Sequence, residues 1–175
     1  MSHITALSTQ SDSAVEALLD AAFGPGRQQR TAYKIRAGMP PIAHLSFAAL
    51  DARGTMVGLL QSWPVALIDG KGTEHPLVMV GPVAVLPTLQ QGGIGKELMR
   101  ELMAQARARA CDPLMMIGDP EYYGRFFGFS AAGTAGWEAP GPVERHRLLA
   151  QSVDGRPLPG TGRLGPRSTG LRAAC

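Results

Sequence analysis

Apolar positions near the start of the chain recur every three or four residues, and this spacing predicts helices. Residues 12–23 carry one continuous apolar face, and Ser11 or Ser13 supplies the side-chain oxygen that an N-cap needs. The Gly-Pro-Gly sequence at 24–26 ends this helix. Residues 27–37 predict a second, shorter and more polar helix, which stops before a segment rich in glycine and proline.

The pattern changes to short apolar runs after residue 44. Residues 45–50, 55–68 and 77–85 are rich in apolar side chains, and turn sequences at 51–54 and 69–72 separate them. Turns this short join neighbouring antiparallel strands. This part of the chain therefore predicts an antiparallel meander of three strands.

A second change of spacing follows the meander. The helical period returns over residues 94–110, and the apolar run 113–118 predicts a buried strand. A strand, a crossover helix and a second strand form a βαβ unit, so the strands at 77–85 and 113–118 should be parallel. A short helix at 122–127 and a last strand at 146–153 complete a mixed α/β (α+β) fold. If the two parallel strands diverge, they leave a cleft for a ligand.

Charge is unevenly distributed along the 175 residues. The formal net charge is +3, and residues 151–175 supply all of it, with four arginines against Asp154. That segment lacks aromatic residues, whereas nucleic-acid binders usually interleave basic and aromatic side chains on a folded face. We therefore expect one domain over residues 1–154, a Gly/Pro/Arg-rich C-terminal tail over 155–175, and no nucleic-acid partner.

The two cysteines, Cys111 and Cys175, have neither metal-ligand spacing nor the pattern of a disulfide framework. This usage predicts no metal site and a reducing compartment. No secretory signal precedes the first helix, and glycine or proline interrupts the apolar runs before they reach a membrane-spanning length. The sequence predicts a cytoplasmic protein without a membrane partner.

Residues 83–96 hold three glycines between a predicted strand and a predicted helix. Unpaired N–H groups at a helix N-terminus attract anions, and glycines let a phosphate approach the backbone. Two common phosphate motifs fail here. A P-loop requires glycine at Gln90 and a hydroxyl residue at Glu97, and the dinucleotide pattern that starts at Gly93 requires glycine at Leu98.

A third pattern, Gln/Arg-x-x-Gly-x-Gly/Ala, matches Gln90, Gly93 and Gly95. With it the sequence resembles the GNAT superfamily of acyl-CoA-dependent N-acyltransferases over residues 4–150. The block 118–129 is similar to the Gly-Asp-x-x-Tyr-Tyr-x-Arg-Phe-Gly-Phe pattern of the bacterial predicted N-acetyltransferases. The alternative interpretation, a tight strand-to-helix turn without a ligand, suits an isolated glycine cluster better than this pair of motifs.

The resemblance implies a GNAT-like mixed sheet whose splayed cleft holds acetyl-CoA as cosubstrate. Pantetheine is expected to pair with the main chain of residues 83–85, and the pyrophosphate to lie on N–H groups of residues 91–96. The Lys96 side chain either adds a charge contact or is simply solvated. The residues expected to bind the cosubstrate are Val83, Ala84, Val85, Gln90, Gln91, Gly92, Gly93, Ile94, Gly95 and Lys96.

The resemblance also implies a tyrosine as the proton donor to the departing CoA thiolate. A phenol with a pKa of about 10 suits a thiolate with a pKa of about 8.5. An extra phenylalanine in Phe126–Phe127 alters the family spacing. Counted from the N-terminal side the donor is Tyr123, whereas counted back from Gly128 it is Gly124, which has no side-chain proton. We therefore select Tyr123, with Tyr122 as the alternative; both could instead be packing residues.

No residue stands out as the general base that would deprotonate the attacking amine. Asp119 and Glu121 lie near the expected cleft, and a chain of waters is the alternative. Residues that qualify by position alone are His44, His75 and Glu138.

The substrate side in this family is formed by the first two helices and the late strands. This chain has several charged and aromatic residues there, namely Arg27, Arg30, Tyr33, Arg36, Trp63 and Trp137. For the arginines, a solvated helix face is favoured over recognition of an acidic substrate.

The expected function is transfer of acetyl from acetyl-CoA to a primary amine, by direct attack within a ternary complex. The acceptor is a small molecule or a protein that bears the amine, and the habit of the superfamily favours a homodimer. Two alternatives stay open. One is a module that binds acyl-CoA without turnover, and the other is a transferase for a longer acyl group or an alcohol acceptor.

Overall fold

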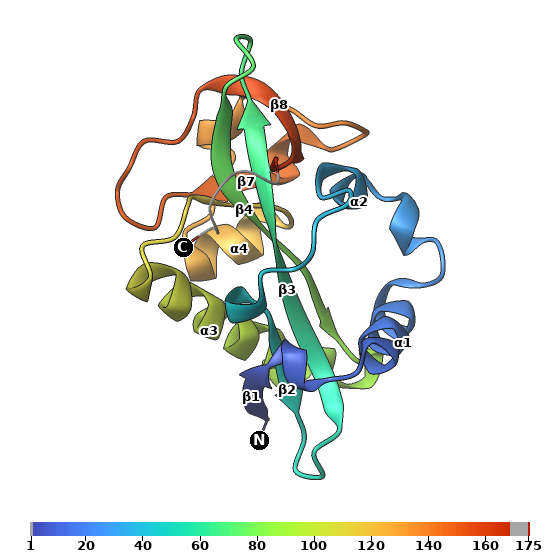
Figure 1. Ribbon diagram of the computed structural model, residues 1–175. Helices are drawn as coiled ribbons and strands as arrows, with labels where there is room; N and C mark the ends of the chain where they lie inside the picture. Colours follow the sequence, from blue (N-terminus) through green and yellow to red (C-terminus); the bar gives the residue numbers. More distant parts are fainter. Residues whose placement is uncertain (1, 169–174) are drawn as a thin grey trace.

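A long strand, β3 (Met56–Ile68), runs through the middle of a mixed sheet in the computed structural model, which describes residues 2–168 and 175 (Figure 1). β2 (Phe47–Leu50) pairs with the first half of β3, β8 (Thr161–Pro166) with its second half, and β4 (Glu74–Val85) along most of it. The remaining strands are β1 (His3–Ala6), β5 (Leu114–Ile117), β6 (Gly136–Glu138) and β7 (Leu148–Gln151). The order is β1-β2-β3-β4-β5-β7, with β8 joining β3 to β6 off this path.

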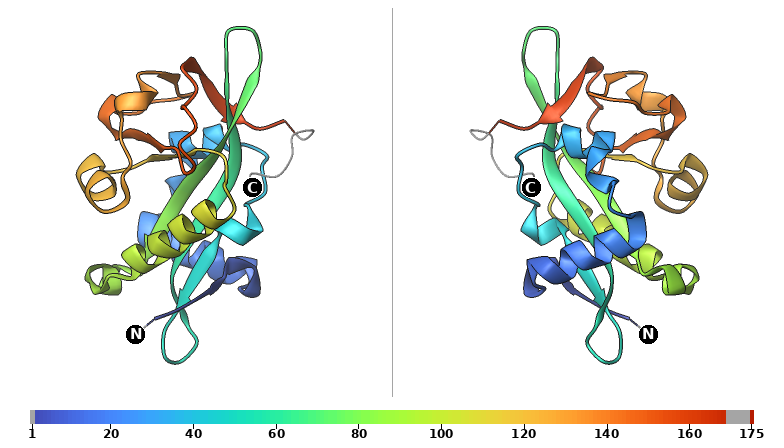
Figure 2. Two further views of the ribbon diagram at one scale, coloured as in Figure 1. Left: turned by 90° about the vertical axis from the view of Figure 1, so that its left-hand side faces the viewer. Right: turned by 90° about the vertical axis from the view of Figure 1, so that its right-hand side faces the viewer.

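Two helices cover opposite faces of the sheet. α1 (Asp12–Phe23) packs on β3 and β4 from one side, and α3 (Ile94–Ala108) packs on β2, β3 and β4 from the other (Figure 1). Side chains alternate across β3, so Leu59 joins the core under α1 and Leu60 the core under α3. The two views of Figure 2 face α3 and α1 in turn. The shorter helices are α2 (Thr31–Ile35) and α4 (Pro120–Phe127).

β4 and β5 begin as parallel neighbours and then separate. Their last paired residues are Met79 and Met115, although β4 continues to Val85 and β5 to Ile117. Beyond that pair the two strands no longer bond to each other, and this edge of β4 faces a cleft. The expected mixed sheet with a splayed parallel pair is confirmed.

The first helix, the meander and the crossover helix lie where the spacing predicts them. The Ser11 side chain accepts a hydrogen bond from the backbone N–H of Ala14 at 3.2 Å, which caps α1. The second predicted helix is wrong over most of its length. Residues 27–29 form a 3₁₀ turn and α2 has only five residues, because Arg30 between them adopts an extended backbone conformation.

The strand predicted at 146–153 is present as β7, but it is not the last strand. β8 lies inside the predicted tail and pairs with β3 and β6, so the sheet extends past the predicted boundary at residue 154. Glycine makes this pairing feasible, since a Cβ at Gly162 would lie 2.6 Å from the carbonyl oxygen of Ile68. The same glycines are the reason why the sequence predicts a Gly/Pro/Arg-rich tail, and not a strand, for this segment. Residues 169–174 of that predicted tail lie outside the described residues.

Cys111 and Cys175 form a disulfide, so the expectation of no disulfide is wrong. The two residues are 64 positions apart in sequence, and tertiary contacts bring them together. The Arg167 guanidinium lies 3.1 Å from a carboxylate oxygen of Asp112, beside Cys111, and Ser168 bonds to Glu74. The cysteines therefore no longer indicate a reducing compartment, because disulfides persist mainly in oxidising surroundings. Within residues 2–168 and 175, no helix is long and apolar enough to cross a bilayer.

Candidate active site

The first part of the site is a cavity of about 300 Å³ between the edge of β4, the start of α3 and α4. Its lining consists of Val83, Val85, Gln90, Gln91, Gly93, Gly95, Lys96, Tyr122 and Tyr123. Most of the residues predicted to bind the cosubstrate therefore meet at one place, together with both candidate tyrosines. Ala84 and Ile94 do not line the cavity, because both are buried in the core. Gly92 is exposed and also lies outside the lining.

The free edge of β4 presents the main chain of Val83 and Val85 to this cavity. The N–H of Leu86 donates to the carbonyl oxygen of Val57 in β3 at 2.9 Å. Alternate residues of an antiparallel strand point their N–H and C=O groups to opposite sides, so Ala84 also faces β3. The N–H and C=O groups of Val83 and Val85 consequently point toward the cleft, where an extended ligand could bond to them as a further strand would.

The glycine-rich turn at residues 92–95, called the glycine turn below, places backbone N–H groups at the other end of the same cavity. A 3₁₀ segment, Pro87–Gly92, leads into Gly93, whose φ of 81° is left-handed and favours glycine. The first helical hydrogen bond of α3 runs from the N–H of Glu97 to Gly93. The preceding N–H groups have no partner within the helix, and groups of this kind attract anions. A Cβ at Gly95 would meet only Val85 and Val83, at 3.9 and 4.0 Å, so glycine here keeps the cavity open.

Lys96 lies at the rim of this cavity, where its ammonium nitrogen is 3.8 Å from the ring centroid of Phe126. Phe126 is the exposed member of the Phe126–Phe127 pair, at 45% exposure, whereas Phe127 is buried. A cation held over an aromatic face at the edge of an anion site is well placed to neutralise a phosphate.

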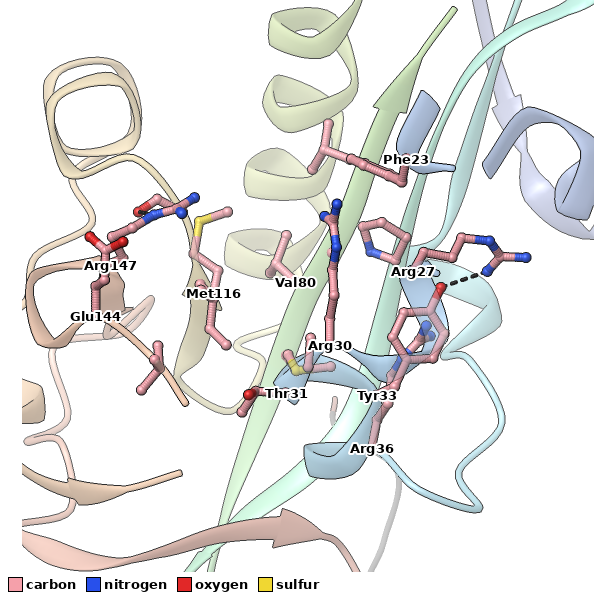
Figure 3. A pocket seen from close by; sticks show the side chains of 18 of the residues that line it. Phe23, Arg27, Arg30, Thr31, Tyr33, Arg36, Val80, Met116, Glu144 and Arg147 are labelled. Carbon is pink, nitrogen blue, oxygen red and sulfur yellow. Dashed lines mark hydrogen bonds between the residues drawn. The ribbon is translucent and has the colours of Figure 1, made fainter. Parts of the chain in front are cut away.

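A second, larger cavity of about 1020 Å³ adjoins the first, and Figure 3 shows the side chains that line it. Its wall combines β4, β5, the α2 region and the loop before β7. Residues of its lining that matter below are Arg30, Tyr33, Arg36, Asp119, Glu144 and Arg147. Two residues, Val83 and Tyr123, line both cavities. The two spaces therefore meet at the Tyr123 side chain.

Tyr123 is held by the way α4 begins and ends. Asp119 caps the helix, with its side chain accepting from the N–H of Glu121 at 3.0 Å. Gly128 ends it with a left-handed φ of 79°, and the N–H of Phe129 donates to the carbonyl oxygen of Tyr123 at 3.2 Å. The extra phenylalanine is accommodated in the last turn of α4, beyond Tyr123.

The two tyrosines differ in their surroundings. Burial raises the pKa of the Tyr123 hydroxyl to about 12, and the neighbouring Tyr122 and Asp119 add to this shift. Burial also raises the pKa of Tyr122, although the Arg100 charge opposes it. Tyr122 lines only the smaller cavity. Of the two tyrosines, only Tyr123 lines both cavities, and its hydroxyl stays protonated throughout the neutral range.

The Tyr123 ring lies directly on Gly118, and replacing Gly118 with alanine tests this contact. A Cβ at Gly118 would approach Cδ2 and Cε2 of Tyr123 to 2.8 and 2.9 Å, so the ring must move. We expect turnover to fall about 10-fold or more, with a loss of roughly 1–3 kcal/mol in the free energy of unfolding from overpacking. Gly26→Ala is the matched control, since a Cβ there meets nothing within 4 Å. Steady-state kinetics and thermal unfolding of both variants check this, and unchanged turnover in Gly118→Ala would contradict it.

The structure places some of the candidate general bases in the larger cavity and others outside both cavities. Asp119 lines the larger cavity, and so does Glu144, which sequence reasoning missed. Glu144 follows a Gly/Pro-rich segment that gives no periodic signal. The other candidates, Glu121, His44, His75 and Glu138, line neither cavity. His75 instead bonds to Asp69 at 2.9 Å in the β3–β4 turn.

The arginines near α2 do not form a solvated face, which corrects the sequence interpretation. Arg27 is 4% exposed and bonds to Asp20 at 2.9 Å, to Glu16, and to the Tyr33 hydroxyl at 2.6 Å. The bond between Arg27 and Tyr33 is drawn in Figure 3. Arg36 is 6% exposed. Only Arg30 of this group remains exposed.

Comparison with known proteins places this geometry in a family. A model of the Acetyltransferase (GNAT) family matches residues 13–129. This range includes both the glycine turn and the segment 118–129 that contains the two tyrosines. The chain belongs to this family. The GNAT match also covers the splayed strands β4 and β5.

Individual relatives support this assignment. The uncharacterized N-acetyltransferase YjhQ of Escherichia coli K12 is 32% identical over 95 residues, which span 52% of this chain and 52% of that protein. The match therefore spans about half the length of this curated relative. A GNAT acetyltransferase from Brucella melitensis, solved with acetyl-CoA, is 26% identical and has a TM-score of 0.61, covering 92% of this chain and 93% of that one.

A further solved structure shares the fold. YhbS from Escherichia coli, solved in complex with CoA, has a TM-score of 0.70 at 19% identity, covering 95% of this chain and 89% of that one. The GNAT fold thus extends over nearly the whole chain, including part of the segment beyond residue 154.

Proposed function

We propose that this chain is an N-acetyltransferase that moves acetyl from acetyl-CoA to a primary amine within a ternary complex. The observation that carries the proposal is the position of Tyr123, which lines both the smaller cavity beside the start of α3 and the larger cavity. Acetyl-CoA in the Brucella melitensis relative and CoA in YhbS support the choice of cosubstrate. The free edge of β4 and the N–H groups before Glu97 match an extended pantetheine and its pyrophosphate.

The residues of the chain fall into separate roles in this reaction. A bound acetyl thioester supplies an electrophilic carbonyl carbon and a thiolate leaving group. An amine held in the larger cavity attacks that carbon, and its proton passes to Glu144, Asp119 or water. The Tyr123 hydroxyl donates its proton to the sulfur as the C–S bond breaks, and solvent restores that proton. Val83 and Val85 hold the thioester arm in place through their main-chain groups.

Release of free thiol from acetyl-CoA over a panel of primary amines tests the proposal. Thiol release that depends on the amine, with formation of the acetylated amine, supports transfer. Tight binding of acetyl-CoA without release by any amine would instead favour the acyl-CoA-binding module, and a preference for longer acyl-CoA esters would favour the other alternative. A cytoplasmic location and a homodimer remain predictions, which cell fractionation and light scattering would check.

The dependence of activity on pH follows from the raised pKa of Tyr123. The attacking amine must be neutral, so kcat/KM should rise with pH as the amine and its base lose protons. A phenol with a pKa of about 12 keeps its proton up to about pH 10, so the profile should then stay level rather than fall. Steady-state rates between pH 6 and about pH 10 check this. A fall with an apparent pKa well below that limit would contradict the assignment of Tyr123 as the donor.

A further inference from the structure

The wall of the larger cavity carries more positive charge than the structure compensates. Arg27, Arg30, Arg36 and Arg147 line it, against Asp119 and Glu144. Arg27 is neutralised by its ion pairs with α1. Among the residues that the structure describes, no carboxylate forms an ion pair with any of the other three arginines. A cavity of this kind attracts an anion.

Arg36 is the most deeply buried of the three, at 6% exposure. Its guanidinium carbon lies 4.1 Å from the ring centroid of Tyr33 and 3.6 Å from that of Trp63, so it is held between two aromatic rings. Its Nη1 atom is buried and has no hydrogen-bond partner among the described residues. Burial lowers the pKa of Arg36 to about 10, which leaves it charged at neutral pH. A buried charge without a counter-ion is costly unless the protein uses it.

Trp63, one of the two rings that hold Arg36, is itself held in place by a hydrogen bond. Its indole N–H donates to the carbonyl oxygen of Gly81 at 2.8 Å, where the register of β3 and β4 shifts. The aromatic support of Arg36 is therefore tied to the strand that borders the cleft. The Arg36 charge therefore lies beside the cavity between two rings and has little exposure to solvent.

Arg30 and Arg147 are the exposed cations of the same cavity. Figure 3 shows Arg30 extending past Val80, and Arg147 on the far side of Met116. The guanidinium carbon of Arg30 is 5.2 Å from the ring centroid of Phe23, and Arg147 makes a long 3.4 Å bond to the carbonyl oxygen of Gly118. Among residues 2–168 and 175, no group accepts from the remaining donors of either guanidinium, so these donors are available to a ligand.

Resting on the function proposed above, we infer that the acceptor is a small molecule carrying, besides its amine, an anionic group such as a carboxylate or a phosphate. Arg30 contacts the anion directly. Arg36 lies deeper in the same wall and adds a positive charge, and Arg147 lies on the opposite side of the cavity, where it adds a further positive charge. The planar guanidinium fork suits both anions. The same positive field lowers the pKa of the acceptor ammonium, which helps to supply the neutral amine that attacks.

Matched acceptors test this inference. Amino acids with two to six carbons between amine and carboxylate are compared with their carboxamides, and phosphoethanolamine with ethanolamine. We expect the favoured anionic acceptor to exceed its neutral partner about 10-fold or more in kcat/KM, because only the anion can form charge-assisted hydrogen bonds with the guanidinium groups. The two anion series distinguish carboxylate from phosphate. Equal rates for every matched pair would overturn the inference.

Variants assign the preference to the arginines. Arg30→Gln should raise KM for the anionic acceptor roughly 10- to 100-fold and leave the neutral partner unchanged. Arg53→Gln, in the exposed β2–β3 turn, is the control and should change neither. Arg36→Lys keeps the charge if Arg36→Gln fails to fold, and it should retain part of the preference. A loss of activity that is equal for both members of a pair would mean a structural role and would overturn the assignment.

Binding separates this inference from the proposed function. If no amine is acetylated, the transfer reaction fails, and the anion site is then judged by titrating the CoA-bound protein with the N-acetylated anionic and neutral compounds. Calorimetry should still show anion-selective binding that Arg30→Gln removes. Absence of that binding would overturn the inference, as would a marked preference for the N-terminus of an acidic peptide over every small amine.

Discussion

Replacing Gly95 with leucine is expected to abolish acetyl-CoA binding while leaving the fold at least as stable as before. A Cβ at this position has only ordinary contacts with Val85 and Val83, so the protein tolerates it. The rest of the side chain must occupy the cavity over the first turn of α3. Removing Gly from a helix gains up to about 1 kcal/mol. Stability and binding should therefore change in opposite directions.

The size of the binding loss follows from the contacts that the leucine excludes. Each charge-assisted hydrogen bond from a backbone N–H to a phosphate contributes about 1.5–3 kcal/mol, so loss of two of them weakens binding roughly 100-fold or more. Calorimetry with acetyl-CoA and thermal unfolding measure the two effects. Gly70→Leu, in the open β3–β4 turn, is the control, because a Cβ there meets nothing within 4 Å. Wild-type affinity in Gly95→Leu would place the cosubstrate elsewhere.

The fold could be predicted where spacing and turn chemistry act locally. The Asp69 side chain accepts from the N–H groups of Lys71 and Thr73 at 2.9 and 3.0 Å, which makes the β3–β4 turn readable from its residues alone. The period change after Pro87 likewise predicts α3. The β8 strand could not be predicted this way, because its glycines are required by close contact with β3 and not by its own local conformation.

The burial of the arginines depends on partners distant in sequence. Arg27 is paired with acids of α1, and Arg36 is held by Trp63, which lies on β3. A polar stretch of this composition is usually solvated, so the sequence favours the wrong interpretation. The smaller cavity, where we propose that the cosubstrate binds, is different, since most of its lining comes from the continuous segment 83–96. A site made by one segment can be predicted from a motif, whereas the acceptor cavity is assembled from several elements.

Glu144 and Arg147 illustrate the same limit on the acceptor side. They lie in the loop before β7, and the Thr31 hydroxyl donates to the carbonyl oxygen of Pro142 at 2.6 Å. This bond ties the loop to α2 across 111 residues of sequence. No local pattern encodes such a contact, and the acceptor side of the site is defined only once the chain is folded.

Replacing Tyr123 with phenylalanine is expected to lower kcat by about 100- to 10,000-fold, the usual contribution of a positioned proton donor. The affinity for acetyl-CoA should stay close to the wild-type value, because the ring and its packing on Gly118 are kept. The free energy of unfolding should change little, since no hydrogen bond of the Tyr123 hydroxyl is lost within the described part of the chain. Rapid-mixing kinetics, calorimetry and thermal unfolding measure the three quantities.

Tyr122→Phe is the comparison that gives this result its meaning. Tyr122 lies next to Tyr123, with ring centroids 4.9 Å apart, yet it lines only the cosubstrate cavity. Its loss should leave kcat within a few-fold of the wild type, because Tyr122 does not line the larger cavity in which we propose that the amine binds. If Tyr122→Phe shows the larger defect, the donor is Tyr122, the alternative that the sequence offers, and not Tyr123. If both variants retain full turnover, the thiolate leaves without a tyrosine proton, and the position of Tyr123 between the cavities serves packing alone.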